Sequence, residues 1–288
     1  MKAEDGMGAP KVAVVSGATS GIGLATARAL VGQRFRIIAM GRHSGRASAA
    51  DAELRAGAEG AEIDWVIADF SRLADVRRAA GDIVRLTGHI DVLVNNAGLL
   101  LDQRSTTEQG FETTFAVNHL APFLLTTSLL PLLKAAPAHV INVSSVGHTM
   151  IDDMRWHDLQ MERDFAPLAA YAQSKLANVL FTRELARRFH GEGLVASAVH
   201  PGLVASRFPL TGGADTRAYY AAAQASGEAL TSEQGADTVV WLATAPGAAL
   251  PSGGYFAERR RIAPSAAGQD DDGARRLWTI SERLVGQA

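Results

Sequence analysis

Short runs of β-branched and other apolar residues alternate along this chain with longer Ala- and Leu-rich stretches. The apolar runs cover residues 11–15, 35–40, 63–68, 91–95 and 139–143, and a sixth precedes Pro201. Helical composition is typical of the stretch up to Gly32, of residues 46–55 and of Tyr171 to His190. Strands that alternate with helices predict a parallel, doubly wound sheet. We therefore expect one α/β domain over residues 10–288, with a mostly parallel seven-stranded sheet flanked by helices, after a flexible N-terminus over residues 1–9.

The helical segment from Gln109 to Lys134 is predicted to be interrupted near its middle. Pro122 should kink it, because proline lacks the N–H that an interior helical position donates. Asn118 also needs a reason inside a helix. It either caps a broken half-helix or uses its amide to hold an ordered water.

Composition narrows the class of protein. A chain of 288 residues that is 47% hydrophobic can bury a large core. The net charge of −2 argues against a nucleic acid partner, and Arg259 to Arg261 is short enough to be a solvated loop. No cysteine is present, which fits a cytoplasmic location. No membrane span is expected, because the longest apolar run, Leu120 to Leu133, is broken by polar residues and prolines and is shorter than ~20 residues.

A glycine-rich turn follows the first apolar run and precedes the first helical stretch. It contains Gly17, Gly21 and Gly23. Glycines let the backbone approach a pyrophosphate closely, and the N-terminus of the following helix offers N–H groups and a favourable dipole to the anion. A plain turn would also use glycines.

Polar residues stand at the ends of later strands, where the carboxyl edge of a parallel sheet forms a ligand crevice. Asp69 follows the third strand, although it would equally cap the helix that begins near Leu73. Asn95 ends the fourth strand and leads into Ala97 and Gly98, which a turn would also contain. Ser145 follows the fifth strand, where serines are common turn formers.

Tyr171 and Lys175 are four residues apart and so share a helix face. An ammonium group beside a phenol favours the phenolate, which predicts a lowered pKa for Tyr171 and a usable acid–base pair. By itself the pair also fits a solvated helix face.

Taken in order, these motifs resemble the short-chain dehydrogenase/reductase family. The resemblance rests on Ser16-Gly17-x3-Gly21-x-Gly23, Asn95 to Gly98, Asn118, Ser145, Tyr171-x3-Lys175 and Pro201-Gly202. The stretches 117–120, 171–188, 198–202 and 274–278 are similar to the retinol-dehydrogenase-like branch. Ser16 replaces the family's more frequent threonine and keeps its hydroxyl. The polar stretch Met1 to Pro10 differs from the N-terminal membrane anchor that the branch often carries, which weakens the case for retinol itself as the substrate.

The resemblance implies a Rossmann-type fold and a role for each matching residue. Tyr171 would be the general acid/base, Lys175 would lower the tyrosine pKa and bind the nicotinamide ribose, and Ser145 would polarise the substrate oxygen. Asn118 would hold the water of a proton relay. The glycines would wrap the pyrophosphate, Asp69 would meet the adenine, Asn95 would lie near the adenosine ribose, and Pro201, Gly202 and Ser206 would cover the nicotinamide. The expected cofactor-binding set is Gly17, Ser20, Gly21, Ile22, Gly23, Arg42, Asp69, Asn95, Ala97, Gly98, Tyr171, Lys175, Pro201, Gly202 and Ser206.

The end of the second strand predicts that NADP(H) is preferred over NAD(H). An NAD enzyme places an acid there for the ribose hydroxyls, and that acid would repel a 2′-phosphate. Here Gly41 takes the acid's place, and Arg42 follows with a guanidinium that can reach a phosphate. Arg46 can add a second charge, although an exposed loop arginine fits it better.

The expected activity is hydride transfer between the nicotinamide and a carbonyl or alcohol substrate. Residues 146–170 and 207–230 would form substrate loops, with an apolar pocket made by Met150, Met154, Trp156, Phe208, Tyr219 and Tyr220, unless these residues pack on the core. A catalytically silent nucleotide sensor on the same fold is the alternative. A sugar epimerase would need a larger C-terminal domain than this chain offers. The oligomeric state stays open, with a homodimer or a homotetramer as the candidates.

Overall fold

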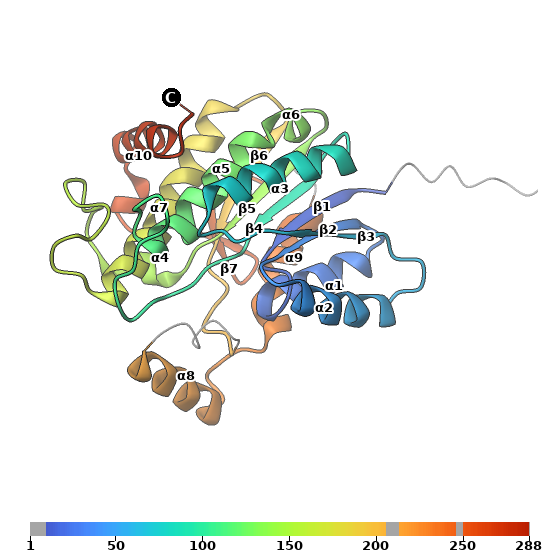
Figure 1. Ribbon diagram of the computed structural model, residues 1–288, viewed down its shortest axis with the longest axis horizontal. Coiled ribbons are helices and arrows are strands. Elements are labelled where there is room, and N and C mark those ends of the chain that lie inside the picture. The colour runs from blue at the N-terminus through green and yellow to red at the C-terminus, as the bar shows by residue number, and fades with distance from the viewer. Residues whose placement is uncertain (1–9, 206–212, 246–249, 288) are drawn as a thin grey trace, which may run out of the picture.

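The computed structural model describes residues 10–205, 213–245 and 250–287. One eight-stranded sheet in the order β3-β2-β1-β4-β5-β6-β7-β8 runs through its centre (Figure 1). All neighbouring strands are parallel except β7 and β8. The predicted doubly wound α/β fold is therefore confirmed. The strands are β1 (Val12–Ser16), β2 (Arg36–Gly41), β3 (Ile63–Ile67), β4 (Val92–Asn95), β5 (Ala138–Val143), β6 (Leu194–Val199), β7 (Gly254–Ala257) and β8 (Arg260–Ile262).

Helices cover both faces of the sheet. One face carries α1 (Gly21–Val31), α2 (Ser44–Ala56) and α9 (Ser232–Thr244). The other carries α3 (Leu73–Leu86), α5 (Ala121–Ser128) and α7 (Pro167–Arg188), with α10 (Asp271–Leu284) packed on α7. Alternate residues of a strand enter opposite layers, as Val14 and Val15 of β1 do. Because both faces are buried, the strands read as continuous apolar runs, which is why the sequence revealed them.

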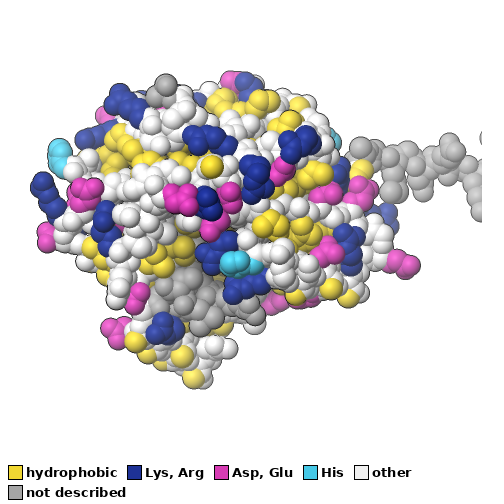
Figure 2. Space-filling model, viewed as in Figure 1, with side chains coloured by type: hydrophobic (Ala, Val, Ile, Leu, Met, Phe, Trp, Pro, Cys, Tyr) yellow, Lys and Arg dark blue, Asp and Glu magenta, His cyan; other side chains and the backbone are white. Residues whose placement is uncertain are grey.

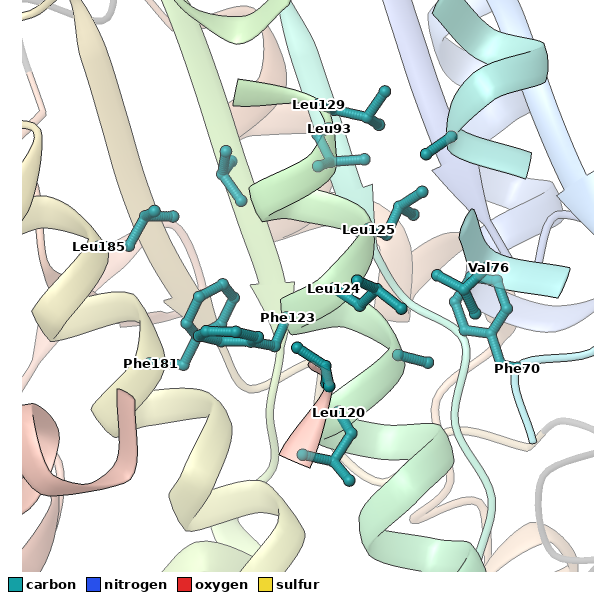
Figure 3. Close-up of a cluster of buried hydrophobic side chains, with 14 of the residues drawn as sticks. Phe70, Val76, Leu93, Leu120, Phe123, Leu124, Leu125, Leu129, Phe181 and Leu185 are labelled. Carbon is teal, nitrogen blue, oxygen red and sulfur yellow. The ribbon is translucent and has the colours of Figure 1, made fainter. Parts of the chain in front are cut away.

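The larger apolar layer fixes the helix that carries Tyr171 and Lys175. Phe123 of α5 and Phe181 of α7 lie against each other, with ring centroids 5.4 Å apart (Figure 3). Trp278 of α10 contacts Phe123 edge-on at 5.0 Å, and the guanidinium of Arg188 lies 4.5 Å from the Trp278 ring centre. Helix α7 is thus held between α5 and α10.

The predicted interruption near Asn118 is a change of helix type. The helix begins at α4 (Thr113–Phe115) and not at Gln109, because the buried Glu112 carboxylate accepts the N–H groups of Thr114 and Phe115. It continues as the π-helical turn η1 (Ala116–Leu120) and then as α5. Pro122 follows this π-helical turn directly, as the second residue of α5, and the helical segments continue through it without a break. A short α6 (Leu130–Leu133) follows.

Strand β8 was not predicted. Residues 259–261 were expected to form a solvated loop, but Glu258 and Arg259 adopt positive φ angles of 49° and 56° and turn the chain back onto β7. All three residues of β8 are exposed, so they lack the apolar alternation by which the other strands were recognised.

The expected substrate loops contain short helices. The 3-10 helix η2 (Val146–Met150) follows β5, and α7 begins at Pro167, four residues before Tyr171. Helix α8 (Ala214–Ser226) projects from the body of the molecule (Figure 1), and a second 3-10 helix, η5 (Ala267–Gln269), precedes α10.

Ser206, Phe208 and the N-terminal residues 1–9 lie outside the described residues. In the part of the chain that is described, no helix has the length and apolar character needed to cross a membrane.

Candidate active site

The glycine turn has the geometry of an anion-binding loop. Gly17 and Gly21 have φ angles of 68° and 57°, which side chains disfavour. A Cβ at Gly23 would lie 2.4 Å from the Gly17 carbonyl oxygen, so the first turn of α1 packs directly under the loop. The first turn of α1 contains no acidic residue. Its unpaired N–H groups therefore fit the pyrophosphate of a dinucleotide. A plain turn would not require a helix N-terminus packed this closely under the glycines.

Ser16 and Asn96 fasten this turn to the loop after β4. The buried Ser16 hydroxyl accepts the N–H groups of Asn96 and Ala97 at 2.9 and 3.0 Å. The Asn96 amide donates to the Ser16 carbonyl at 2.9 Å. The Ser16 hydroxyl thus holds the loop after β4, and the more usual threonine would offer the same hydroxyl.

Asn95 does not reach the cofactor cleft, contrary to the expectation that it lies near the adenosine ribose. Its amide donates to Thr126 at 2.9 Å and to Asn142 at 2.8 Å inside the protein. Successive strand residues point to opposite faces, so its neighbour Asn96 faces the cleft instead. Asn96 was not predicted from the sequence, although the alternation of side chains along a strand could have indicated it.

A cleft of about 450 Å³ runs along the carboxyl edge of the sheet from the glycine turn to Tyr171. Most of the predicted site residues line it: Gly17, Ser20, Gly21, Ile22, Arg42, Asp69, Ala97, Gly98, Ser145, Tyr171, Lys175, Pro201 and Gly202. Gly23, Asn95 and Asn118 do not line it. Residues that were not predicted as site residues complete the wall, among them Thr19, Phe70, Leu101, Val117 and Val204.

Asp69 is not the cap of the helix after β3. Helix α3 begins after Arg72 without a side-chain cap. The Asp69 carboxylate accepts the N–H and the hydroxyl of Ser71 at 2.9 and 2.8 Å. It therefore shapes the turn at the cleft wall, where adenine contact was predicted.

Two arginines line the cleft beyond β2, Arg42 directly after the strand and Arg46 at the start of α2. The Arg42 Nε donates to the His43 Nε2 at 3.0 Å. A Cβ at Gly41 would lie 2.5 Å from the Thr19 methyl group. The structure thus leaves no free space for an acidic side chain at position 41.

Ser145, Tyr171 and Lys175 meet at the other end of the cleft. The Lys175 Nζ is 5.6 Å from the centre of the Tyr171 ring and donates to the Val143 carbonyl at 2.9 Å. The Tyr171 and Ser145 side chains are hydrogen-bonded. Ser145 also accepts the Gly147 N–H at 3.0 Å, and Gly147 lies so close to the Tyr171 ring that a Cβ there would be 3.2 Å from it.

Burial controls the acidity of this pair. Lys175 is only 4% exposed, and burial lowers its pKa to about 8. Burial likewise raises the pKa of Tyr171 above its usual value, against the opposing effect of the hydrogen bond from Ser145. The expected lowering of the Tyr171 pKa is therefore wrong for the protein by itself, because desolvation of the phenolate outweighs the hydrogen bond from Ser145.

Asn118 links the loop after β4 to α7. Its side-chain oxygen accepts the Leu99 N–H at 2.8 Å, and its amide donates to the Leu99 carbonyl and the Ser174 hydroxyl, both at 2.9 Å. It lies inside a continuous helix and does not cap a half-helix. The ordered water remains a prediction, and this residue's place in a π-helical turn is one that functional sites often use.

The predicted apolar pocket is largely wrong. Met154 is 3% exposed and belongs to the core, and Trp156 donates to Asp153 and packs under Arg276. Met150 and Tyr219 are 57% and 61% exposed. Of the six residues Tyr220 alone lines the cleft among those described, and the alternative of packing on the core holds for Met154 and Trp156.

Charge on the molecular surface is mixed. Basic and acidic side chains lie next to each other on the face shown in Figure 2, with no basic stripe across it. Within the described residues, no group of three His, Asp or Glu side chains is placed to hold a metal ion.

Known proteins resemble this chain over nearly its whole length. The family model for short chain dehydrogenases matches residues 11–209. Retinol dehydrogenase 12 of Mus musculus is 38% identical over 281 residues, which are 96% of this chain and 86% of that protein. Retinol dehydrogenase 13 of Homo sapiens is 37% identical over 284 residues, which cover 96% of this chain and 85% of that protein.

Solved structures agree with this assignment. An uncharacterized protein from Mycobacterium paratuberculosis has a TM-score of 0.78 at 30% identity, over 96% of this chain and 94% of that one. An NADP complex of RhlG from Pseudomonas aeruginosa has a TM-score of 0.67 at 26% identity, over 86% of this chain and 94% of that one. The chain thus belongs to the short-chain dehydrogenase/reductase family of oxidoreductases, in its retinol-dehydrogenase-like branch.

Proposed function

We propose that this protein is an NADP(H)-dependent oxidoreductase that transfers a hydride between nicotinamide and an apolar carbonyl or alcohol substrate. The observation that carries the proposal is the meeting of Ser145, Tyr171 and Lys175 at one end of a cleft that begins at the glycine turn. A nicotinamide dinucleotide would span that distance, and when bound it supplies the hydride.

The chain's own residues would handle the proton. In reduction, Tyr171 donates its phenol proton to the substrate carbonyl oxygen, while the Ser145 hydroxyl orients that oxygen. The raised pKa of Tyr171 keeps the phenol protonated near neutral pH, which suits a general acid. In oxidation the phenolate of the same side chain would take the hydroxyl proton.

Lys175 would hold a positive charge close to the reacting oxygen. Its pKa of about 8 leaves it mostly protonated at neutral pH, and its Nζ is anchored on the Val143 carbonyl. Asn118 would act behind the cleft, where it fixes the loop after β4 and the helix that carries Tyr171. Its water-holding role in a proton relay stays part of the proposal.

The preference for NADP(H) over NAD(H) is supported by the end of β2. Arg42 directly after the strand and Arg46 at the start of α2 line the cleft, and the side chain of Thr19 fills the space beside Gly41 that an acid would need. A 2′-phosphate at this place would gain a charge-assisted contact and meet no carboxylate from position 41.

The apolar substrate is supported by the cleft wall and by the relatives. Leu99, Leu101, Val117 and Val204 contribute apolar surface to the cleft. The similar proteins are named for retinol, an apolar alcohol. We propose a bulky apolar aldehyde or ketone, without naming the molecule.

A catalytically silent sensor would not need these groups. A sensor would bind the nucleotide but has no need of the acid–base phenol of Tyr171 beside Ser145. Cytoplasmic location and assembly into a homodimer or homotetramer stay predictions, which cell fractionation and light scattering on a sizing column measure.

The test is a panel of carbonyls followed by NADPH absorbance. Bulky apolar aldehydes and ketones should be reduced at the highest kcat/KM, and small polar sugars and hydroxy acids at the lowest. NADPH binding without turnover of any carbonyl or alcohol would favour the sensor. Turnover of polar substrates alone would contradict the apolar assignment.

A further inference from the structure

Two histidines hold the peptide unit that joins Ser145 to Val146. The buried His148 places its Nδ1 2.7 Å from the Ser145 carbonyl oxygen. The half-buried His200, which follows β6, accepts the Val146 N–H on its own Nδ1 at 3.2 Å. The carbonyl and the N–H of one peptide unit are therefore each bound by an imidazole.

The partners of these imidazoles fix their tautomers. The Ser265 N–H, which can only donate, points at the His148 Nε2 at 3.0 Å. That nitrogen must accept, so the proton of His148 is on Nδ1 and is donated to Ser145. In His200 the Nδ1 faces two N–H groups, those of Val146 and of Gly202 at 3.4 Å, so its proton is on Nε2.

Both imidazoles must be neutral to make these contacts. A second proton on either ring would bring two N–H groups together and break a hydrogen bond. Burial lowers the pKa of both imidazoles. At His200 the nearby His148 lowers the pKa further, and the negative charge of Glu258 raises it in part. Tyr255 also lies against His148, with its ring in edge contact at 4.9 Å and its hydroxyl 3.5 Å from the His148 Nδ1.

This peptide unit sets where the Ser145 hydroxyl lies. The hydroxyl is two bonds from the backbone that the histidines hold, and it has a further bond to the Gly147 N–H at 3.0 Å. His148 also connects this point to the segment after β8, where Gly268 packs so tightly that a Cβ would meet the Val179 side chain of α7 at 3.1 Å. These contacts fix the position of Ser145 relative to α7, the helix that carries Tyr171.

We propose that His148 and His200 are positioning residues that orient Ser145 for its contact with the substrate oxygen, by holding the two ends of the Ser145–Val146 peptide unit. The proposal rests on the proposed function, because it assigns the histidines to the serine's role in carbonyl reduction. Neither histidine lines the cleft, so neither is assigned a contact with substrate or cofactor.

A matched pair of variants at His148 separates positioning from stability. In His148→Asn the side-chain amide takes the place of Nδ1, so it keeps the donor to Ser145 and loses the acceptor for Ser265. In His148→Gln the amide reaches the place of Nε2, so it keeps Ser265 and loses Ser145. We expect His148→Gln to lower kcat about ten- to a hundredfold, since small misplacement of a reacting group is costly, and His148→Asn to retain kcat within about threefold, by the same reasoning.

His200 offers the complementary pair. His200→Asn keeps an acceptor oxygen near the Nδ1 position, whereas His200→Leu keeps the volume and removes the acceptor. We expect the leucine variant to lose kcat and the asparagine variant to recover most of it, with NADPH affinity little changed in both. In a Ser145→Ala background, His148→Gln should have no further effect on kcat, because it acts through the serine.

The tautomers themselves are measured without turnover, by ¹H–¹⁵N NMR of the histidine side chains, with the His148 and His200 signals assigned by the variants. We expect the Nδ1–H form for His148 and the Nε2–H form for His200. The opposite tautomers would overturn the positioning role. Equal losses of kcat in His148→Asn and His148→Gln would also overturn it, as would an undiminished effect of His148→Gln in the Ser145→Ala background. Absence of turnover in the unmutated protein would instead defeat the proposed function, and the positioning role with it.

Discussion

Arg42→Ala should selectively weaken the use of NADPH. Arg42 opens the loop after β2, lines the cleft and is exposed. Its Nε donates to the exposed His43, and a 2′-phosphate at the cleft would compete with that neutral partner for the guanidinium. A charge-assisted hydrogen bond is worth about 1.5–3 kcal/mol, which corresponds to roughly ten- to a hundredfold in kcat/KM for NADPH. The same change should leave NADH within about twofold, because that cofactor has no phosphate to bind.

The assay compares kcat/KM for NADPH and NADH in the unmutated protein, in Arg42→Ala and in a control. Arg85→Ala is the control, because Arg85 is an exposed arginine of α3 that does not line the cleft. Added salt should shrink the effect of Arg42→Ala, since the contact is exposed. Adding Gly41→Asp should reverse the preference, but at a cost to both cofactors, because the new Cβ must displace the Thr19 methyl group. Unmutated protein that uses NADH as well as NADPH would refute this reasoning.

Two further predictions concern the glycine turn and the buried lysine. Gly23→Ala should abolish measurable NADPH binding in a fluorescence titration, because its Cβ would lie 2.4 Å from the Gly17 carbonyl oxygen, whereas Gly32→Ala, whose Cβ meets nothing nearer than 3.5 Å, should bind normally. Lys175→Met should abolish turnover and yet raise the melting temperature at pH 7. Burial lowers the pKa of Lys175 from 10.5 to about 8, so the folded state is penalised below pH 8 and the penalty fades as the pH rises to 10.5. A gain in melting temperature that does not shrink over that pH range would contradict the assignment.

The order of elements and most cleft residues could be predicted because they leave local signals. Strands buried on both faces read as apolar runs, and the glycines at Gly17 and Gly21 are required by their backbone angles. The ends of parallel strands necessarily meet at one edge, so Ser145 and Asp69 could be placed on the cleft before the fold was known.

Other features depend on contacts that no local pattern contains. The Glu112 side chain starts the helix before the π-helical turn, and Asn118 is held by Leu99 and Ser174, which are distant in sequence. The pKa of Tyr171 depends on how deeply the fold buries the phenol. Apolar residues such as Met154 fit a core and a substrate pocket equally well until the packing is known.

The central claim is that Tyr171 supplies the proton in carbonyl reduction, and Tyr171→Phe tests it most directly. The variant keeps the ring and removes the hydroxyl. NADPH binding, followed by fluorescence titration, should stay within about threefold, because the glycine turn and Arg42 are untouched. Turnover of the best carbonyl should fall by about 10²–10⁴, the usual loss on removal of a general acid. Turnover near that of the unmutated protein, with binding intact, would contradict the account.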